Sequence, residues 1–298
     1  MKVSKIVILI LIVAAFGAGI YFKDDAINFY NNFNKKIAEL KTQDIGQIIS
    51  EVQKQISTAT PLNVGGTSNN VVLLQSKIIT ETNLQRQENP PIGEAGGSLS
   101  ALKENAKLDA AASAKAQDMF LNQYFEHISP SGVGPGDLAQ KYGYDYIVEG
   151  ENLILGNFSS EQEVVQDWMN SPGHRTNILN NRYTEIGVAV IKGTYKGETV
   201  WIGVQEFGLP LSTCAQPNEA LKNQIDSEKA QLDGLSSEID TAKNQIENIN
   251  KNSPAYRQMV DGYNQLIAQY NSWAEQVKGN IATYNNQVNN FNYCVAGK

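Results

Sequence analysis

The sequence predicts an α+β fold or an α/β/α sandwich for the middle of this 298-residue chain. Helical patterns separated by turn-rich loops are followed by two segments in which apolar and polar residues alternate, and that combination is typical of this class. The composition then changes to Asn- and Gln-rich helical repeats, which predict a separate helical hairpin in the last third of the chain. With 41% hydrophobic residues, the chain has enough apolar side chains to bury at least one core.

Composition excludes several classes of function. The chain carries 24 Lys and Arg against 31 Asp and Glu, a net charge of -7, and it has no clustered basic stretch. We therefore expect no nucleic-acid partner. Two Cys exclude a disulfide-dense scaffold and a four-thiolate zinc site, and two His limit the imidazole chemistry available.

Residues 1–23 have the pattern of a signal anchor or a signal peptide. Residues 6–22 are uncharged and apolar and follow Lys2 and Lys5. Their length fits either segment type. We favour an uncleaved anchor, because apolar residues continue past the small Gly17 and Gly19. The body of the chain is then extracytoplasmic, in a single-pass cell-membrane protein, or in a secreted protein if the segment is cleaved.

The next boundaries follow from changes in periodicity. Residues 24–58 form an amphipathic pattern that predicts a helical stalk, and residues 59–70 are polar and turn-rich, which predicts a linker. Residues 71–213 form the central domain. Its predicted helices cover residues 75–87, 99–120 and 160–170, and its predicted strands, 185–191 and 199–207, flank a turn at 193–197.

Residues 214–298 predict an antiparallel helical hairpin, packed as a coiled coil. Apolar residues recur at steps of three and four on both sides of a break at residues 250–254, where Ser253 is suited to cap a new helix. Cys214 and Cys294 lie at similar distances from this break. A disulfide between them would clamp the base of the hairpin, contribute on the order of 4 kcal/mol and require an oxidising compartment. The alternative is two unrelated free thiols.

Three polar clusters in the central domain carry possible chemistry. They are residues 125–132, 150–153 and 168–179, and they contain both His of the chain, His127 and His174, together with Glu151. Their residue types allow three interpretations. The first is a Zn²⁺ site with His127 and His174 as ligands, and the second is a hydrolase in which a His oriented by Glu151 activates Ser129 or Ser171. The third is a set of structural hydrogen bonds, with Glu151 at a helix start.

These clusters, with residues 82–89 upstream and 185–188 downstream, resemble the CAP superfamily, also called SCP-like. That family includes cysteine-rich secretory proteins, antigen 5 and pathogenesis-related proteins. The similarity is greatest to its bacterial branch, through His-x-Ser-Pro-x-Gly at residues 127–132, Gly-Glu-Asn at 150–152 and Ser-Pro-Gly-His-Arg-x-Asn-Ile-Leu at 171–179. The resemblance spans residues 75–208, a little under half of the chain.

The resemblance implies an α/β/α sandwich with a cleft of two His and two Glu, which binds divalent metal in some animal members. His127, His174 and Glu151 match three of these positions. The chain departs from the pattern at the second glutamate, where Asn170 or Ser171 stands. Glu206, at the end of the last predicted strand, is a weaker candidate for that place, and a missing carboxylate weakens both metal binding and acid–base catalysis.

From these features we expect a membrane-anchored extracytoplasmic CAP protein that binds a lipid, glycan or envelope-protein ligand, rather than an enzyme. His127, Glu151 and His174 are the expected ligand-binding residues. One alternative is a metal-dependent hydrolase of envelope polymers or peptides. Another is a scaffold that presents the hairpin as an interaction arm, which includes self-association through it.

Overall fold

The computed structural model describes residues 56–65, 71–89 and 98–297 of the chain. These residues belong to two compact units, a central unit of residues 56–216 and 290–297 and a hairpin unit of residues 217–289. The predicted anchor and nearly all of the predicted stalk lie outside the described residues. Within the described ranges, every helix is too short or too polar to span a membrane.

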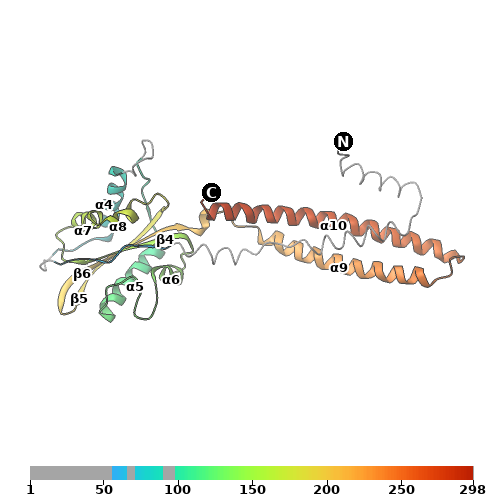
Figure 1. Ribbon diagram of the computed structural model, residues 1–298, viewed down its shortest axis with the longest axis horizontal. Helices are drawn as coiled ribbons and strands as arrows, with labels where there is room; N and C mark the ends of the chain where they lie inside the picture. Colours follow the sequence, from blue (N-terminus) through green and yellow to red (C-terminus); the bar gives the residue numbers. More distant parts are fainter. Residues whose placement is uncertain (1–55, 66–70, 90–97, 298) are drawn as a thin grey trace. The chain divides into compact units, whose positions relative to one another are not determined.

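The central unit is built on a mixed sheet of six strands (Figure 1). Its middle is antiparallel, with β4 (Tyr146–Gly156) paired to β6 (Glu198–Pro210) and β6 paired to β5 (Glu185–Tyr195). Three short strands lie at the edges of the sheet, each parallel to its neighbour. They are β1 (Ile56–Thr58) and β2 (Leu62–Gly65) beside β4, and β3 (Lys103–Glu104) beside β5. The strand β4 is therefore paired along both of its edges.

Helices cover both faces of this sheet (Figure 1). One face carries α4 (Gln75–Glu88), α7 (Glu161–Asn170) and α8 (Pro172–Ile178). The other carries α5 (Ala106–Asn122) and α6 (Pro135–Lys141), and a single 3-10 turn, η1 (Leu211–Thr213), follows β6. Each face has its own apolar cluster, with Trp168 and Phe207 in one and Met119 and Leu153 in the other. The predicted three-layer α/β/α arrangement is confirmed for this unit.

Local signals in the sequence explain several element boundaries. Ser160 caps α7 by accepting a hydrogen bond from the backbone of Glu163 at 3.1 Å, and acidic residues in the first turn favour the positive end of the helix dipole. The predicted strand pair is confirmed, with a tighter turn than expected. Lys196 and Gly197 both have positive φ, 49° and 88°, as a two-residue hairpin turn requires.

Three expectations need correction. Residues 103–104 are extended and pair with β5, so the predicted helix 99–120 begins only after Asn105, whose side chain caps α5. Residues 56–58 form β1 and residues 62–65 form β2, where a stalk end and a linker were expected. Residues 146–156, expected as loop, form β4. The physical reason is shared, because pairing with a distant strand supplies backbone hydrogen bonds that local periodicity does not reveal.

The hairpin unit contains α9 (Glu219–Asn248) and most of α10 (Pro254–Val295). Asn218 caps α9 through a hydrogen bond from Leu221 N at 3.1 Å, and Ser253 accepts one from Ala255 N at 3.3 Å, so the predicted restart at Pro254 is confirmed. Buried residues recur along α10 at the predicted steps of three and four: Tyr263, Ile267, Tyr270, Ala274, Val277, Ile281, Tyr284 and Val288. The coiled coil itself stays a prediction.

The predicted disulfide is present between Cys214 and Cys294, whose Cα atoms are 5.7 Å apart. Both cysteines belong to the central unit, together with the last turns of α10. There, Cys214, Phe291 and Val295 are part of the same buried apolar cluster as Trp168. The bond therefore fixes the end of the chain to the core of the central unit.

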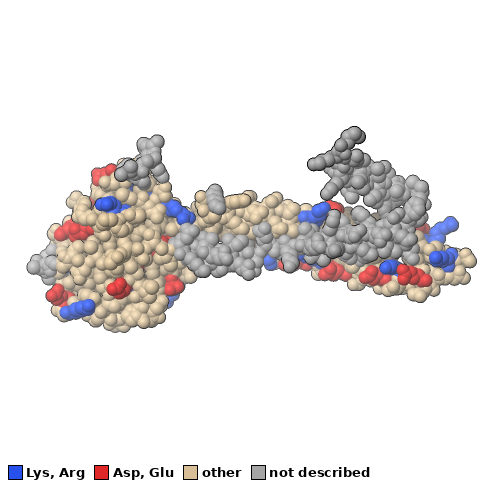
Figure 2. Space-filling view, viewed as in Figure 1, with Lys and Arg blue, Asp and Glu red and all other residues tan. Residues whose placement is uncertain are grey.

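Charged side chains of both signs are scattered over the visible face of each unit (Figure 2). On α9, several acidic side chains are exposed, among them Asp226, Asp233 and Glu238. On the visible face, the Lys and Arg side chains of the described residues form no continuous patch.

Candidate functional site

Three buried glutamates lie on one face of the central sheet. Successive side chains of a strand point to opposite faces, so Glu149 and Glu151 of β4 share the face that α5 covers. Glu206 of β6 is paired with Glu151 in the strand register and therefore lies beside it on that face. All three residues have 0% exposure. Glu151 is thus in the middle of a central strand, and its predicted place at a helix start is wrong.

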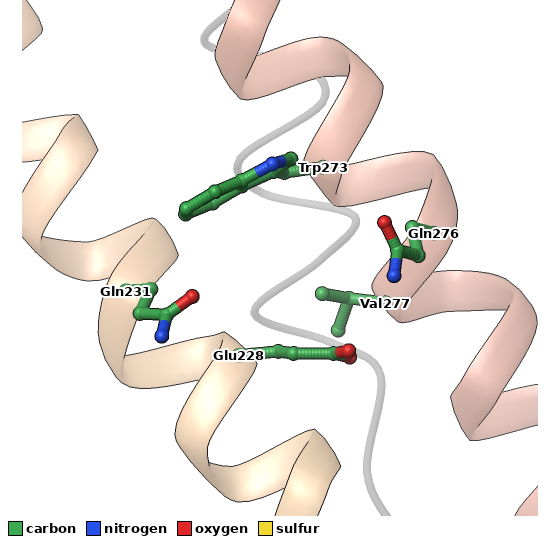
Figure 3. Close-up of a pocket in the computed structure, with 5 residues that line it drawn as sticks. All are labelled: Glu228, Gln231, Trp273, Gln276 and Val277. Carbon is green, nitrogen blue, oxygen red and sulfur yellow. The ribbon is translucent and has the colours of Figure 1, made fainter.

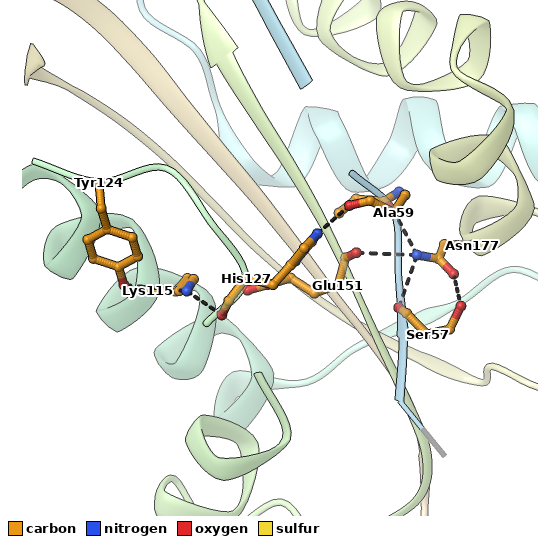
Figure 4. Close-up of polar contacts among 8 residues, drawn as sticks. Ser57, Ala59, Lys115, Tyr124, His127, Glu151 and Asn177 are labelled. Carbon is orange, nitrogen blue, oxygen red and sulfur yellow. Dashed lines mark hydrogen bonds and ion pairs between the residues drawn. The ribbon is translucent and has the colours of Figure 1, made fainter. Parts of the chain in front are cut away.

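His127 meets this group from the loop that follows α5 (Figure 4). Its Nδ1 atom is 2.5 Å from Oε1 of Glu151, and its Nε2 atom contacts the backbone carbonyl oxygen of Ala59. A carbonyl oxygen only accepts hydrogen bonds, so Nε2 must carry a proton. Nδ1 is engaged by the carboxyl group of Glu151, so both ring nitrogens of His127 are bonded to protein groups.

Lys115 is a component of the site that the sequence analysis missed. Its side chain is fully buried on α5, and its Nζ atom donates a hydrogen bond to the carbonyl oxygen of His127 at 2.6 Å (Figure 4). Burial lowers the pKa of Lys115, and the charges of Glu151 and Glu206 act in the opposite direction. A signal was present, since Lys115 falls on the buried face of α5 with Leu108, Ala112 and Met119.

The carboxyl groups of Glu149 and Glu206 favour their neutral forms. Burial is the largest cause of the raised pKa of Glu206, and the charges of Glu151 and Glu149 raise it further. Burial also raises the pKa of Glu149, and the charge of Glu151 adds to that effect. Both causes disfavour the carboxylate form of Glu206, because burial and neighbouring negative charge each destabilise a further negative charge.

His174 lies in α8 and is only 1% exposed. Its Nδ1 atom is 2.8 Å from Oγ of Ser171. Burial, followed by the positive charge of His127, lowers the pKa of His174 to about 4, so the ring is neutral near pH 7. His174 is thus within electrostatic range of His127, and the contacts of the described chain include no hydrogen bond between His174 and Glu151.

A second set of polar side chains fixes β4 from the opposite face. Asn177 of α8 donates to Oδ1 of Asn152 at 3.0 Å and to the carbonyl oxygen of Glu151 at 3.2 Å. Asn152 donates in turn to Gln205 at 3.1 Å, and Gln205 donates to Thr82 at 2.7 Å. These hydrogen-bonded side chains link α8, β4, β6 and α4. They hold the backbone of Glu151 from the face of the sheet opposite to its side chain. Asn177 therefore has a structural role in this network.

Arg86 fastens the end of α8, which positions His174 and Asn177. It is 1% exposed, and its guanidinium donates to the carbonyl oxygens of Ile178 at 2.7 Å and Asn180 at 2.8 Å. Sequence reasoning did not single out this residue.

The described arrangement does not fit the expected zinc site. Nδ1 of His127 faces Glu151 and Nε2 faces a backbone carbonyl, so neither ring nitrogen is free to bind a metal. In the described ranges, no three His, Cys, Asp or Glu side chains are grouped so that they would hold a metal ion.

The arrangement also does not assemble the hydrolase triad that was one interpretation of the sequence. Oγ of Ser129 is 2.8 Å from Oγ of Ser131 and accepts a hydrogen bond from Val133 N at 3.0 Å. Ser171 is bonded to His174, whereas Glu151 is bonded to His127. A serine, a histidine and the orienting carboxylate are therefore not aligned as one triad.

A small hollow in the hairpin unit lies between α9 and α10 (Figure 3). Its volume is about 160 Å³, and it is lined by Glu228, Gln231, Trp273, Gln276 and Val277. Asn280 of α10 donates to both carboxylate oxygens of Glu228, at 3.1 and 2.9 Å. This contact pairs the carboxylate of Glu228 across the two helices, and we assign the hollow no role.

Comparison with known proteins identifies relatives of the central unit. Residues 81–207 match the family model "CAP: Cysteine-rich secretory protein family". The uncharacterized protein YkwD of Bacillus subtilis (strain 168) is 34% identical over 158 residues, which are 53% of this chain and 58% of YkwD. The uncharacterized membrane protein YlbC of the same organism is 35% identical over 80 residues, which are 27% of this chain and 23% of YlbC. The chain thus spans less than two thirds of either relative.

Two solved structures are also similar. An outer surface protein from Borrelia burgdorferi has 24% identity and a TM-score of 0.39, over 45% of this chain and 91% of that one. An extracellular protein containing a SCP domain from Bacillus anthracis str. Ames has 29% identity and a TM-score of 0.35, over 45% of this chain and 39% of that one.

Proposed function

Residues 81–207 of this chain form a CAP domain, and from that premise we propose that the protein is an extracytoplasmic binding protein rather than an enzyme. The observation that carries the proposal is the state of His127. Both of its ring nitrogens face protein acceptors, whereas a general base needs a free nitrogen for the substrate's proton. Held in this way, His127 donates through Nε2 to a backbone carbonyl oxygen, and a carbonyl group of a bound ligand could take that place.

Two features support a location outside the cytoplasm. The disulfide between Cys214 and Cys294 is stable in an oxidising compartment. The apolar residues 6–22 have the composition of a signal anchor, and the relative YlbC is itself named a membrane protein. We expect the full chain in the membrane pellet of fractionated cells after an alkaline carbonate wash. Release of the protein into the medium would mean that the segment is cleaved.

The proposed ligand is a lipid, a glycan or an envelope protein, bound near His127 and Glu151. We expect the full-length protein to be retained by at least one of three probes: phosphatidylglycerol vesicles, cell-wall sacculi, or an unfolded test polypeptide such as reduced, alkylated lactalbumin. Retention should fall about tenfold in His127→Gln, because the variant loses a charge-assisted hydrogen bond. Ser131→Ala, on the same loop, is the control.

The same samples decide between binding and catalysis. Unaltered probes after prolonged incubation would agree with a binding protein. Breakdown of a probe that stops in Glu151→Gln would contradict the proposal and favour a hydrolase. A role of the helical hairpin as an interaction arm, or in self-association, stays a prediction.

A further inference from the structure

The site is covered by a segment of the chain itself. Residues 56–65, here called the edge segment, run parallel to β4 along the edge that β6 does not occupy. Ser57 is in register with Gly150 and Thr58 with Glu151, and pairing resumes between Leu62 and Ile154. The break between the two pairings contains Ala59 and Pro61. Proline has no backbone N–H to donate to a ladder, which agrees with its place in the break.

Two contacts reach backbone carbonyl oxygens of the edge segment, and one involves a side chain, since Oγ of Ser57 donates to Oδ1 of Asn177 at 2.7 Å (Figure 4). The ring of His127 donates to the carbonyl oxygen of Ala59, and Asn177 donates to the carbonyl oxygen of Ser57 at 3.2 Å. Further along, Asn157 N donates to the carbonyl oxygen of Gly65 at 2.8 Å. Such contacts hold the main chain of an extended peptide, whatever most of its side chains are. This is the manner in which peptides add a strand to a sheet edge.

Only one side chain of the edge segment is buried, that of Ala59. It faces Gly173, where an added Cβ atom would be 2.8 Å from the Cβ of Ala59. A larger residue at either position would therefore collide with the other. By contrast, Ile56 and Val64 remain 42% and 40% exposed, and Thr60 is exposed too. The site thus accepts a small side chain at Ala59, partly buries Ser57, Pro61 and Leu62, and leaves the remaining side chains exposed.

Little apolar burial holds the edge segment in place. Segments with few buried contacts open at a lower free energy than the core of a protein does. Attachment through the same chain favours the closed state, because it gives the segment a high effective concentration at its site. An external peptide with the same features would meet a preformed groove whenever the segment leaves it.

We propose that the outer edge of β4, with His127, Asn177 and Gly173, is a groove that binds an extended polypeptide with a small residue at the position of Ala59. In this chain, the edge segment fills the groove and stands in for that ligand. The inference rests on the proposed function, and it selects polypeptide from the three ligand classes considered there. Groove and segment lie in the same compact unit.

The test uses the full-length protein and a fluorescent peptide with the sequence of residues 55–66. Ala59→Trp should expel the edge segment, because the indole cannot fit against Gly173. Thr60→Trp places the same side chain at the exposed neighbouring position and is the matched control. We expect Ala59→Trp to bind the peptide at least about 100-fold more tightly than the wild type and Thr60→Trp do, since only the opened groove escapes intramolecular competition. A peptide with tryptophan in place of Ala59 should not bind.

Equal peptide binding by Ala59→Trp and Thr60→Trp would overturn the inference. If Ala59→Trp retains vesicles or sacculi but not the peptide, the inferred ligand class is wrong and the proposed function stands. If Ala59→Trp retains none of the probes, the inference and the proposed function are both contradicted.

Hydrogen exchange of the wild type gives a second test that does not depend on how the variant folds. Amides of β4 that face the edge segment should exchange at least about tenfold faster than those that face β6. Exchange of both sets at one rate, through unfolding of the whole unit, would show that the segment is a permanent strand and would overturn the inference.

Discussion

Gly187→Ala is expected to lower the free energy of unfolding of the central unit by about 4 kcal/mol, a loss that single substitutions rarely reach. Gly187 lies in β5 directly beneath the first turn of α5. An added Cβ atom would overlap backbone atoms of Leu108 and Asp109, which cannot move aside as a flexible side chain does. The hydrogen bond of 2.9 Å from Val188 N to the carboxylate of Asp109 ties the same turn to the same strand.

Urea unfolding followed by tryptophan fluorescence would measure this effect. The matched control is Gly193→Ala in the same strand, where the new atom would be 2.9 Å from ring atoms of Phe120 and from nothing else as close. That ring is only partly buried, so we expect a loss of about 1 kcal/mol there. Equal effects at the two positions would contradict the idea that the backbone contact of α5 is decisive. The functional consequence is direct, because α5 carries Lys115.

Glu206→Gln is expected to make the central unit more stable than the wild type at about pH 8, with a difference that shrinks toward about pH 5. The pKa of a glutamate is near 4.5 in the unfolded chain and well above that for Glu206 in the fold. Between these two pKa values, the folded state keeps a proton that the unfolded state has released. The stability of the wild type therefore falls as pH rises from 4.5 toward the folded pKa, by about 1.4 kcal/mol for each step of one in pH.

Glutamine removes this penalty because it is neutral at every pH. Urea unfolding at three pH values would test the expectation, with Glu198→Gln, an exposed residue of the same strand, as control. His174, whose pKa is lowered to about 4, makes both proteins less stable as pH falls below 6.5. This contribution is the same in both proteins, so it cancels in the difference between their free energies of unfolding. A difference that does not grow with pH would show that Glu206 is ionised in the fold.

Several parts of the site were accessible from the sequence. The motifs at residues 127–132, 150–152 and 171–179 identified the family, and His127 and Glu151 do meet, as the resemblance implied. The spacing of Cys214 and Cys294 about the break at residues 250–254 predicted their disulfide. The motifs are local, and the pairing of the cysteines follows from their spacing about the break. Both can therefore be recognised without knowledge of the fold.

Other parts depended on which strands pair. Glu206 lies beside Glu151 only because β6 pairs antiparallel with β4 in one register, and a shift by one residue would move it to the other face. The edge segment was missed for a related reason. Its strands have three and four residues, too few for an alternating pattern to be recognised.

By itself, then, the sequence determined the family of the central domain, three of its helices and its β5–β6 hairpin, because motifs and periodicity are properties of neighbouring residues. Only the tertiary structure decided that Lys115 is buried against the backbone of His127, that Glu206 joins Glu151, and that the backbone of Ala59 contacts the ring of His127. Each of these contacts joins a side chain or strand to a partner in another element. Packing, rather than local preference, sets them.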